Sequence, residues 1–226
     1  MIGIIGAMDH EIAVIKEGMN IVSEEDVLGS RYYIGTIGNN DVILTKCGVG
    51  KVNAAISTTV LINTYECDYI INTGIAGGFP GLSTRDVIIG SKLLYSDVDV
   101  TVFGYSLGQI PGMPLHLCPS LDSVVRVKST LRKIGINYKE ATIYTGDKFV
   151  TSLDHLVQFK EATAVACEME GGAIAHVCVK AGVDFIVLRY ISDIVGEESQ
   201  VNDYAAFELE MANQSAKICL ELVNNL

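Results

Sequence analysis

Three carboxylates stand where apolar, strand-like segments of this sequence end, and they are the residues best suited to acid–base chemistry. Glu11 follows the run IGIIG, Glu170 lies in the segment CEMEGG, and Asp193 ends the run DFIVLRYISD. In an open α/β sheet, ligands bind beyond the carboxyl ends of the strands, so we expect the three side chains to converge there. Carboxyl groups held in different surroundings can serve as general acid and general base for one reaction.

Each carboxylate also has a purely structural interpretation. Glu11 lies in the first turn of a predicted helix, where the helix dipole stabilises an acid by about 0.3–1 kcal/mol. Asp193 is able to cap the segment that follows it. Glu170 is different, because Ile174 and Val177 lie four and seven residues further on and place it on the apolar side of a predicted helix. An unpaired carboxylate is costly there, so Glu170 calls for a partner.

Other motifs are less informative. The stretch NTGIAGG allows the backbone to approach a ligand closely, but tight packing of the chain explains its glycines equally well. GVGK lacks the length and the Ser or Thr of a Walker loop. His176 and Cys178 have no metal-ligand partners at suitable spacing, and a dinucleotide fingerprint is missing. We therefore expect neither a metal nor an organic cofactor.

The elements that must position these residues alternate between strands and helices. Strand-length apolar runs occur at residues 2–6, 41–48, 68–74, 86–95, 141–146 and 184–193, and helical patterns cover 52–66, 168–180 and 204–223. Such alternation predicts an α/β fold with a central mixed, largely parallel twisted sheet flanked by helices, in three layers. The runs RYYIGTIG and DVILTKCG predict an antiparallel hairpin around Asn39 and Asn40. With no linker or repeat, residues 1–226 read as a single domain.

Composition excludes several classes of function. The net charge of −11 without a basic patch argues against nucleic acid as a partner. No apolar run reaches the length of about 18 residues needed to cross a membrane, so we expect no membrane partner. The six cysteines form no C-x-x-C pair and several lie in apolar runs, as expected for free thiols in a reducing cytoplasm.

Taken in order, GIIGAMDHEI, GVGKVNAA, INTGIAGG, DVTVFGY, GQIPGMP, TGDKF, CEMEGGAIAHVC and RYISD resemble the bacterial 5′-methylthioadenosine/S-adenosylhomocysteine nucleosidases. The resemblance covers essentially the whole chain. It implies a nucleoside phosphorylase-like fold and hydrolysis of the N-glycosidic bond of methylthioadenosine, S-adenosylhomocysteine and 5′-deoxyadenosine, with adenine as a product. It also implies a place in methionine salvage and a homodimer.

The acidic first turn favours the hydrolytic branch of this superfamily. Asp9 and Glu11 stand where a phosphorylase needs a phosphate cradle, and a carboxylate repels a phosphate dianion. A carboxylate beside water is a suitable general base, so the resemblance implies that Glu11 activates water. Asp193 matches the acid that protonates N7 of adenine, and Ser192 is placed to orient its carboxyl group.

The resemblance also implies a binding site for the rest of the nucleoside. Glu170 matches the acceptor of the ribose 2′- and 3′-hydroxyls, and Arg189 either steadies Glu170 or a ribose hydroxyl or forms a structural ion pair. Met169 would pack on the sugar, Phe149 would stack on adenine, and the Val150 backbone would contact the edge of the base. The 5′-alkylthio group would lie among Met8, Val49 and Tyr204, and the glycine-rich stretch would contribute Ile75, Ala76 and Gly77 to the site. Phe103 and Pro111 would belong to the pocket of a partner subunit. Two departures are Ile75, where the family often has a small polar residue, and the loop GEESQVND before Tyr204.

Three alternatives remain on the sequence alone. A phosphate-dependent nucleoside phosphorylase shares the fold, and a 6-amino-6-deoxyfutalosine hydrolase shares the adenine and ribose contacts. The third alternative is a non-catalytic nucleoside sensor, which the loss of any of Glu11, Glu170 or Asp193 would support, and all three are present.

Overall fold

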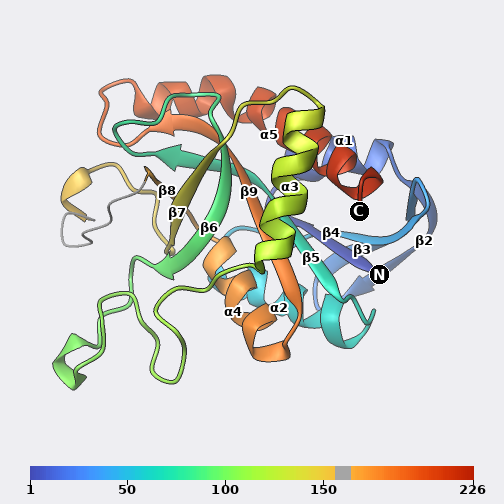
Figure 1. Cartoon of the computed structure of the whole chain (residues 1–226), viewed down its shortest axis with the longest axis horizontal. Helices are drawn as coiled ribbons and strands as arrows, with labels where there is room; N and C mark the ends of the chain where they lie inside the picture. The colour runs from blue at the N-terminus through green and yellow to red at the C-terminus, as the bar shows by residue number, and fades with distance from the viewer. Residues whose placement is uncertain (156–163) are drawn as a thin grey trace.

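A nine-stranded mixed sheet organises the molecule (Figure 1). The computed structural model describes residues 1–155 and 164–226. The strands are β1 (Ile2–Gly6), β2 (Asn20–Val27), β3 (Ser30–Ile37), β4 (Asn40–Lys46), β5 (Tyr69–Gly78), β6 (Val87–Tyr95), β7 (Lys139–Thr145), β8 (Ala164–Glu168) and β9 (Asp184–Ile194). The helices are α1 (Asp9–Glu17), α2 (Lys51–Asn63), α3 (Leu121–Lys133), α4 (Gly171–Ala181) and α5 (Gln200–Asn224), with short 3-10 turns at Thr101–Phe103 and Leu153–His155.

The strand order is β2-β3-β4-β1-β5-β8-β7-β6-β9. Strand β9 also pairs with β5, so the five strands β5, β8, β7, β6 and β9 close into a ring. The central pairs of β1 with β4 and β5, and of β5 with β9, are parallel, which brings their carboxyl ends to the same edge. The predicted α/β fold with a mixed sheet is confirmed, and the predicted hairpin is the antiparallel pair of β3 and β4.

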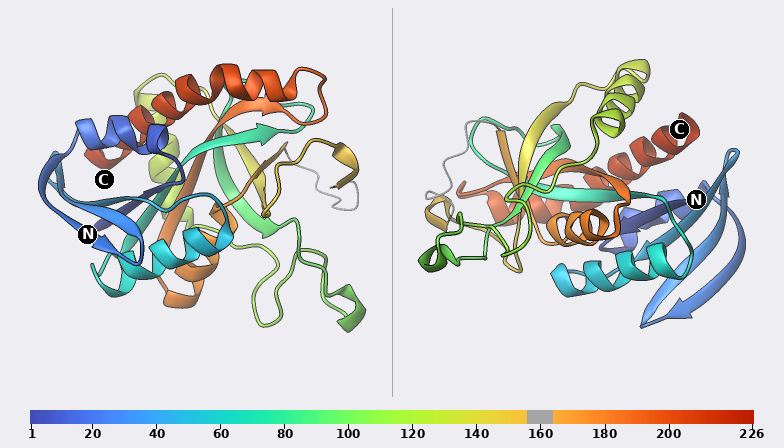
Figure 2. Two further views of the ribbon diagram at one scale, coloured as in Figure 1. Left: turned by 180° about the vertical axis from the view of Figure 1, so that it is seen from behind. Right: turned by 60° about the horizontal axis from the view of Figure 1, so that its bottom comes forward.

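Helices cover both faces of the sheet (Figure 2). Helices α1, α3 and α5 pack on one face through a core that includes Ile15, Leu131 and Met211. Helices α2 and α4 lie together on the other face, over a core that includes Leu61 and Ile174. The sheet is therefore buried from both sides, as its continuous apolar strands require.

The structure corrects three details of the expected helices. In the sequence, Val52, Ala55, Ile56 and Thr59 recur at helical spacing, which predicts that they form the buried side of this helix. In α2, however, Val52 and Ile56 are exposed while Ala54, Ser57 and Leu61 face the core. Helix α4 begins at Gly171 rather than at residue 168, and α5 begins at Gln200 rather than at residue 204. Glu170 is consequently the N-cap of α4 and not a member of its apolar stripe.

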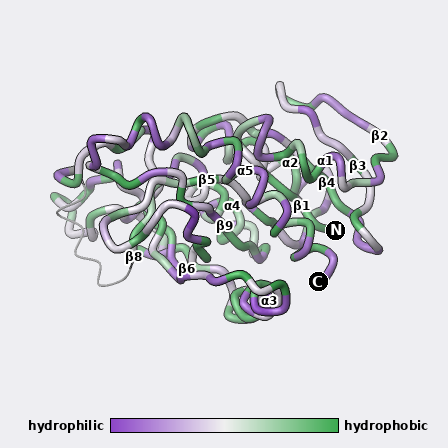
Figure 3. Tube along the Cα trace, turned by 90° about the horizontal axis from the view of Figure 1, so that it is seen from above, coloured by the Kyte–Doolittle hydropathy of each residue, from purple (hydrophilic) through white to green (hydrophobic). Residues whose placement is uncertain are grey.

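Two strands have no counterpart in the expected elements. Strand β2 is mostly exposed and carries Glu24, Glu25 and Asp26 at the edge of the sheet. Figure 3 shows this strand at the periphery of the molecule. Charged side chains on an edge strand discourage pairing with other chains. Strand β8 has only five residues, and it pairs parallel to β7 and antiparallel to β5.

A bulge between β5 and β9 shapes the carboxyl end of β9. Ala76 pairs with Ile191, but the next residue, Gly77, pairs with Asp193, so Ser192 is an extra residue in β9. Consecutive side chains of a regular strand point to opposite faces, and a bulge re-aims them. Ser192 and Asp193 are thereby able to form a hydrogen bond with each other.

Candidate active site

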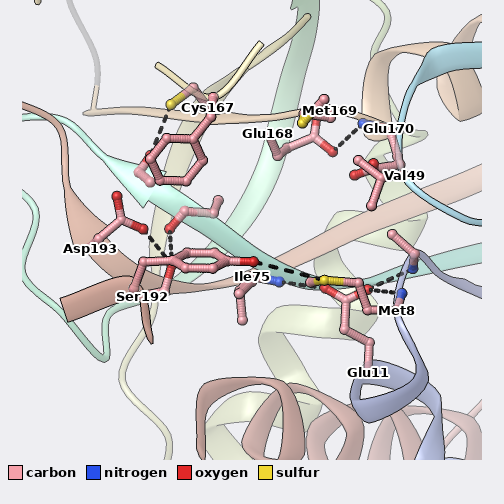
Figure 4. A pocket seen from close by; sticks show the side chains of 15 residues that line it. Met8, Glu11, Val49, Ile75, Cys167, Glu168, Met169, Glu170, Ser192 and Asp193 are labelled. Carbon is pink, nitrogen blue, oxygen red and sulfur yellow. Dashed lines mark hydrogen bonds between the residues drawn. The ribbon is translucent and has the colours of Figure 1, made fainter. Parts of the chain in front are cut away.

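A pocket of about 500 Å³ lies at the carboxyl ends of β1, β5 and β9, and it is roofed by residues that follow β7 and β8 (Figure 4). It is lined by Ala7, Met8, Glu11, Val49, Ile75, Ala76, Gly77, Phe149, Cys167, Glu168, Met169, Glu170, Ser192, Asp193 and Tyr204. Asp193 lies at one end, Glu11 at the other and Glu170 at a third corner, with Ile75 in between. The three carboxylates predicted to converge do so.

Glu11 is held by the backbone around it. Its Oε2 accepts hydrogen bonds of 2.6 Å from the Ala7 N–H and 3.1 Å from the Met8 N–H, and its Oε1 accepts one of 3.2 Å from the Ile75 N–H. Gly74 permits this arrangement, because a Cβ there would clash with the carboxylate. Burial raises the pKa of Glu11, while the charge of Arg189 and the three N–H groups oppose that rise.

Asp193 is 1% exposed and has two side-chain donors. The Ser192 hydroxyl donates to Oδ1 at 2.6 Å, and the Gln200 amide donates to Oδ2 at 2.9 Å. Burial raises the pKa of Asp193, and these two hydrogen bonds limit the rise. A carboxyl group in such surroundings retains a proton at higher pH than a solvated one, which suits a general acid.

Glu170 occupies the N-cap position of α4, and its Oε1 accepts a hydrogen bond of 2.8 Å from the Gly50 N–H and none from the helix itself. Burial raises its pKa to about 8, and the neighbouring Glu168 adds to the rise; Gly50 and Arg189 act in the opposite direction. Oε2 has no protein donor in the described part of the chain, and the residue lines the pocket. This oxygen is available to a ligand hydroxyl.

Arg189 lies beneath the pocket and does not line it. Its guanidinium donates to Glu168 Oε2 at 2.5 Å and to Asn72 Oδ1 at 2.6 Å, and it is 2% exposed. Of the alternatives drawn from the sequence, this geometry favours the structural ion pair over direct contact with Glu170 or a ribose hydroxyl.

Glu168 contacts both Arg189 and the start of α4. Its Oε2 also accepts from the N–H groups of Glu170 and Gly171, at 2.9 and 2.6 Å, and its Oε1 accepts from the Thr145 hydroxyl. The first N–H groups of a helix lack partners within the helix, so Glu168 satisfies them and fixes the backbone of Glu170.

The other predicted residues divide into three groups. Met8, Val49, Ile75, Ala76, Gly77, Phe149, Met169, Ser192 and Tyr204 all line the main pocket. Val150 lines a smaller adjoining cavity with Gln200. Phe103 and Pro111 are exposed and line neither cavity of this single chain.

One wall of the pocket is aromatic. Phe149 meets Tyr204 edge to face, with 5.4 Å between ring centroids. The Tyr204 hydroxyl lies 3.9 Å from the Met8 sulfur. These residues come from the loop after β7, from α5 and from the loop after β1, so the wall joins three distant parts of the chain.

Sequence reasoning did not single out four residues of this region: Ala7, Cys167, Glu168 and Gln200. Glu168 and Arg189 are both charged residues within otherwise apolar segments, and that shared feature is a signal for a buried pair. Gln200 gives no comparable signal, because its contact with Asp193 depends on the turn between them.

The described residues contain no group of three or more His, Cys, Asp or Glu side chains placed to hold a metal ion. None of the helices in residues 1–155 and 164–226 is long and apolar enough to span a membrane.

Comparison with known proteins gives this geometry a context. Residues 1–224 match the model of the phosphorylase superfamily. A 5′-methylthioadenosine/S-adenosylhomocysteine nucleosidase of Marinomonas sp. (strain MWYL1) is 42% identical, over 100% of this chain and 99% of that protein. The crystal structure of the Neisseria meningitidis nucleosidase of that name, in complex with methylthio-immucillin-A, superposes with a TM-score of 0.93 at 35% identity, covering 100% and 99% of the two chains. A futalosine hydrolase of Helicobacter pylori superposes with a TM-score of 0.92 at 33% identity, covering 100% and 97%.

The fold and the match over residues 1–224 define the class of this protein, which is the phosphorylase superfamily. Within that superfamily, the chain belongs to the family of 5′-methylthioadenosine/S-adenosylhomocysteine nucleosidases, which are N-glycosyl hydrolases.

Proposed function

We propose that this chain hydrolyses the N-glycosidic bond of 5′-methylthioadenosine and S-adenosylhomocysteine, and also that of 5′-deoxyadenosine, and releases adenine and the 5′-substituted ribose. The reaction serves methionine salvage and the recycling of S-adenosylmethionine products. The names of the relatives and the three carboxylates around one pocket support this proposal.

One observation carries the choice of water over phosphate. Backbone N–H groups at the start of a helix are the usual cradle for a phosphate. Here those of Ala7 and Met8 are already bonded to the Glu11 carboxylate. A phosphate dianion would lose these donors and meet a negative charge, whereas a water molecule gains a proton acceptor.

The chemistry divides between the two ends of the pocket. The bond between C1′ and N9 breaks as its electron pair moves to adenine, and Asp193 donates its proton to N7. The oxygen of water bonds to C1′, and Glu11 accepts the proton that this water loses. Burial raises the pKa of both carboxyl groups; the charge of Arg189 and three N–H groups oppose the rise at Glu11, whereas the Ser192 and Gln200 hydrogen bonds oppose it at Asp193.

The remaining contacts bind the substrate. The free oxygen of Glu170 accepts from the ribose hydroxyls, and Met169 packs on the sugar. Phe149 stacks on adenine while the Val150 backbone reads the base edge. Met8, Val49 and Tyr204 give the 5′ end of the pocket the apolar character that suits an alkylthio group, and Ile75, Ala76 and Gly77 line the pocket along β5.

The same proposal includes a homodimer of single-domain chains in the cytoplasm. The segment around Phe103 projects from the body of the molecule (Figures 1 and 2), and Phe103 is 77% exposed. Exposed apolar side chains on a projecting segment favour a protein partner, and a second copy would place Phe103 and Pro111 at a neighbouring pocket. The joining of all nine strands in one sheet supports a single domain, and six free cysteines suit the cytoplasm.

The decisive experiment is product analysis in phosphate-free buffer. We expect free adenine and methylthioribose from methylthioadenosine, at a rate unchanged by added phosphate. A requirement for phosphate, with a ribose 1-phosphate product, would make the protein a phosphorylase. Faster release from 6-amino-6-deoxyfutalosine than from methylthioadenosine would assign it to the futalosine branch, and tight binding without any release would make it a sensor.

A further inference from the structure

Gln200, the first residue of α5, joins two groups that face the base end of the pocket. Its Nε2 donates to Asp193 Oδ2 at 2.9 Å and to the Val150 carbonyl at 2.8 Å. Its Oε1 accepts from the Gly196 N–H at 3.0 Å. Gln200 is 3% exposed, so its hydrogen-bonding groups are met by the protein and not by solvent.

These three contacts fix which way the amide points. Because Oε1 is held by the Gly196 N–H, the two N–H bonds of Nε2 must face Asp193 and Val150. The opposite orientation would place Oε1 against two acceptors and Nε2 against a donor. Gln200 is therefore a permanent donor to Asp193.

Ser192, the other partner of Asp193, is adaptable. Its hydroxyl lies 2.6 Å from Asp193 Oδ1 and 3.3 Å from the Ala76 carbonyl. A hydroxyl has one hydrogen and two lone pairs, so it can donate to either oxygen and can accept a hydrogen bond from a protonated Asp193. The Gln200 amide, in contrast, donates a hydrogen bond to Asp193 in both protonation states of that carboxyl group.

We propose that Gln200 is a positioning residue, which holds the Asp193 carboxyl at a set place relative to the Val150 backbone and keeps its proton transferable to the base. This inference rests on the proposed function, because it takes Asp193 as the general acid. Gln200 itself touches no reacting atom.

The surroundings of Asp193 explain why such a donor is needed. Cys167 on β8 and Asp203 and Tyr204 on α5 face Asp193, and each of these groups is neutral or negative. Glu168 and Lys148 line the adjoining cavity with it. Burial raises the pKa of Asp193, and a general acid that holds its proton too firmly transfers it slowly. The Gln200 hydrogen bond stabilises the ionised form and so opposes that rise.

The sign of the effect separates this role from simple packing. Without the Gln200 donor, a still-buried Asp193 binds its proton more tightly, and the alkaline limb of kcat/KM moves to higher pH. If Gln200 only filled space, a replacement of equal length would leave the limb where it is, and one that admitted water would lower the pKa of Asp193 and move the limb to lower pH.

The test compares Gln200→Met and Gln200→Glu with the wild type in adenine release from methylthioadenosine across pH. Gln200→Met keeps the length of the side chain and removes the donor. Gln200→Glu keeps the acceptor for Gly196 and replaces the donor with a carboxyl group. For both variants we expect kcat to fall about tenfold to a hundredfold and the alkaline limb to rise by about one pH unit. Gln214→Met, the same change at a half-buried position of the same helix, should alter neither quantity.

The proposal would be overturned if both kcat and the alkaline limb of kcat/KM were unchanged, or if that limb moved to lower pH. Should Gln200→Met fail to fold, as judged by its thermal unfolding, the isosteric Gln200→Glu carries the same comparison. The protonation of Asp193 can also be followed without turnover, by infrared spectroscopy of protein labelled with ¹³C-aspartate. The carboxyl bands that are missing from the Asp193→Asn spectrum belong to Asp193. A wild type that releases no adenine would refute the proposed function, whereas an infrared titration identical in wild type and Gln200→Met would refute the role of Gln200.

Discussion

Glu170 Oε1 accepts its hydrogen bond from Gly50, and this contact joins the residue before α4 to the residue before α2. Gly50 has a φ of 101°, a conformation that favours glycine. The next residue, Lys51, is anchored by the Asp147 carboxylate on its backbone N–H at 2.8 Å and by Asp97 on its ammonium group at 2.6 Å. Three loops are thus tied together around the proposed ribose acceptor.

We expect Asp147→Ala to raise KM several-fold with a smaller effect on kcat. Its loss frees the Lys51 N–H and loosens the Gly50 donor, so that Glu170 meets the ribose less well. The check is steady-state kinetics with methylthioadenosine and with an analogue that lacks the 2′-hydroxyl. The exposed Asp122→Ala on α3 is the control. Equal losses for both substrates would contradict a role through Glu170.

Asp193→Asn should retain nucleoside binding while kcat falls about a hundred- to ten-thousand-fold. The amide fills the same space but has no acidic proton for N7. Equilibrium binding of methylthioadenosine, together with single-turnover adenine release, measures the two effects separately. Turnover close to that of the wild type would remove Asp193 from the mechanism.

Glu11→Gln should also bind the nucleoside and lose turnover on a similar scale. An amide cannot take a proton from water, and its nitrogen cannot accept the backbone N–H bonds that hold the carboxylate. The assay is run without phosphate, so that phosphate cannot replace water as the nucleophile. If this variant remained active, the base would have to be sought elsewhere in the pocket.

Glu170 should make the folded protein less stable as pH rises. Its pKa is about 8 in the folded protein and about 4.3 in an unfolded chain. The folded state therefore binds more protons between these values, and the free energy of unfolding declines across that window by up to about 1.4 kcal/mol per pH unit. Urea unfolding of wild type and Glu170→Gln at pH 5 and pH 8 isolates this group. The wild type should lose more stability than the variant, and parallel losses would contradict the raised pKa.

Arg189→Met should destabilise the fold by about 3–5 kcal/mol, because it leaves the buried Glu168 carboxylate without its partner. The double variant Arg189→Met with Glu168→Gln should recover part of that loss, since the uncompensated charge is gone. Unfolding free energies of the two single variants and the double variant form a complete cycle. Additive losses would mean that the two residues are not coupled.

The strands that carry the site were predictable because their signals are local. The apolar run before Gly6 and the run before Asp193 have the length and composition of buried strands, and the parallel sheet follows from their alternation with helices. The positions of Glu11 and Asp193 at the carboxyl ends of strands could therefore be predicted from where these apolar runs end.

The parts that were not predicted depend on distant pairing. Strand β8 is five residues long and is defined by its partners β5 and β7. The environment of Glu170 was misjudged because the helix pattern extends across residues 168–170, whereas the helix begins at Gly171 and the Glu168 side chain accepts the N–H groups of Glu170 and Gly171. Gln200 reaches Asp193 only because the chain turns back after β9.

The bulge at Ser192 makes the site depend on the number of residues in β9 as well as on their types. Asp193 pairs with Gly77 only because Ser192 is an unmatched insertion in the ladder. In a ladder without the bulge, Ser192 would pair with Gly77 and Asp193 with Gly78, and the acid would point to the other face of the sheet. A chain with one extra residue in β5, opposite Ser192, would have such a ladder. Such a chain would keep Glu11, Glu170 and the aspartate in order along its length, and yet it would lack an acid in the pocket. An insertion in β5 at this point is therefore more damaging to the chemistry than most substitutions, even though the rest of the sequence would be unchanged.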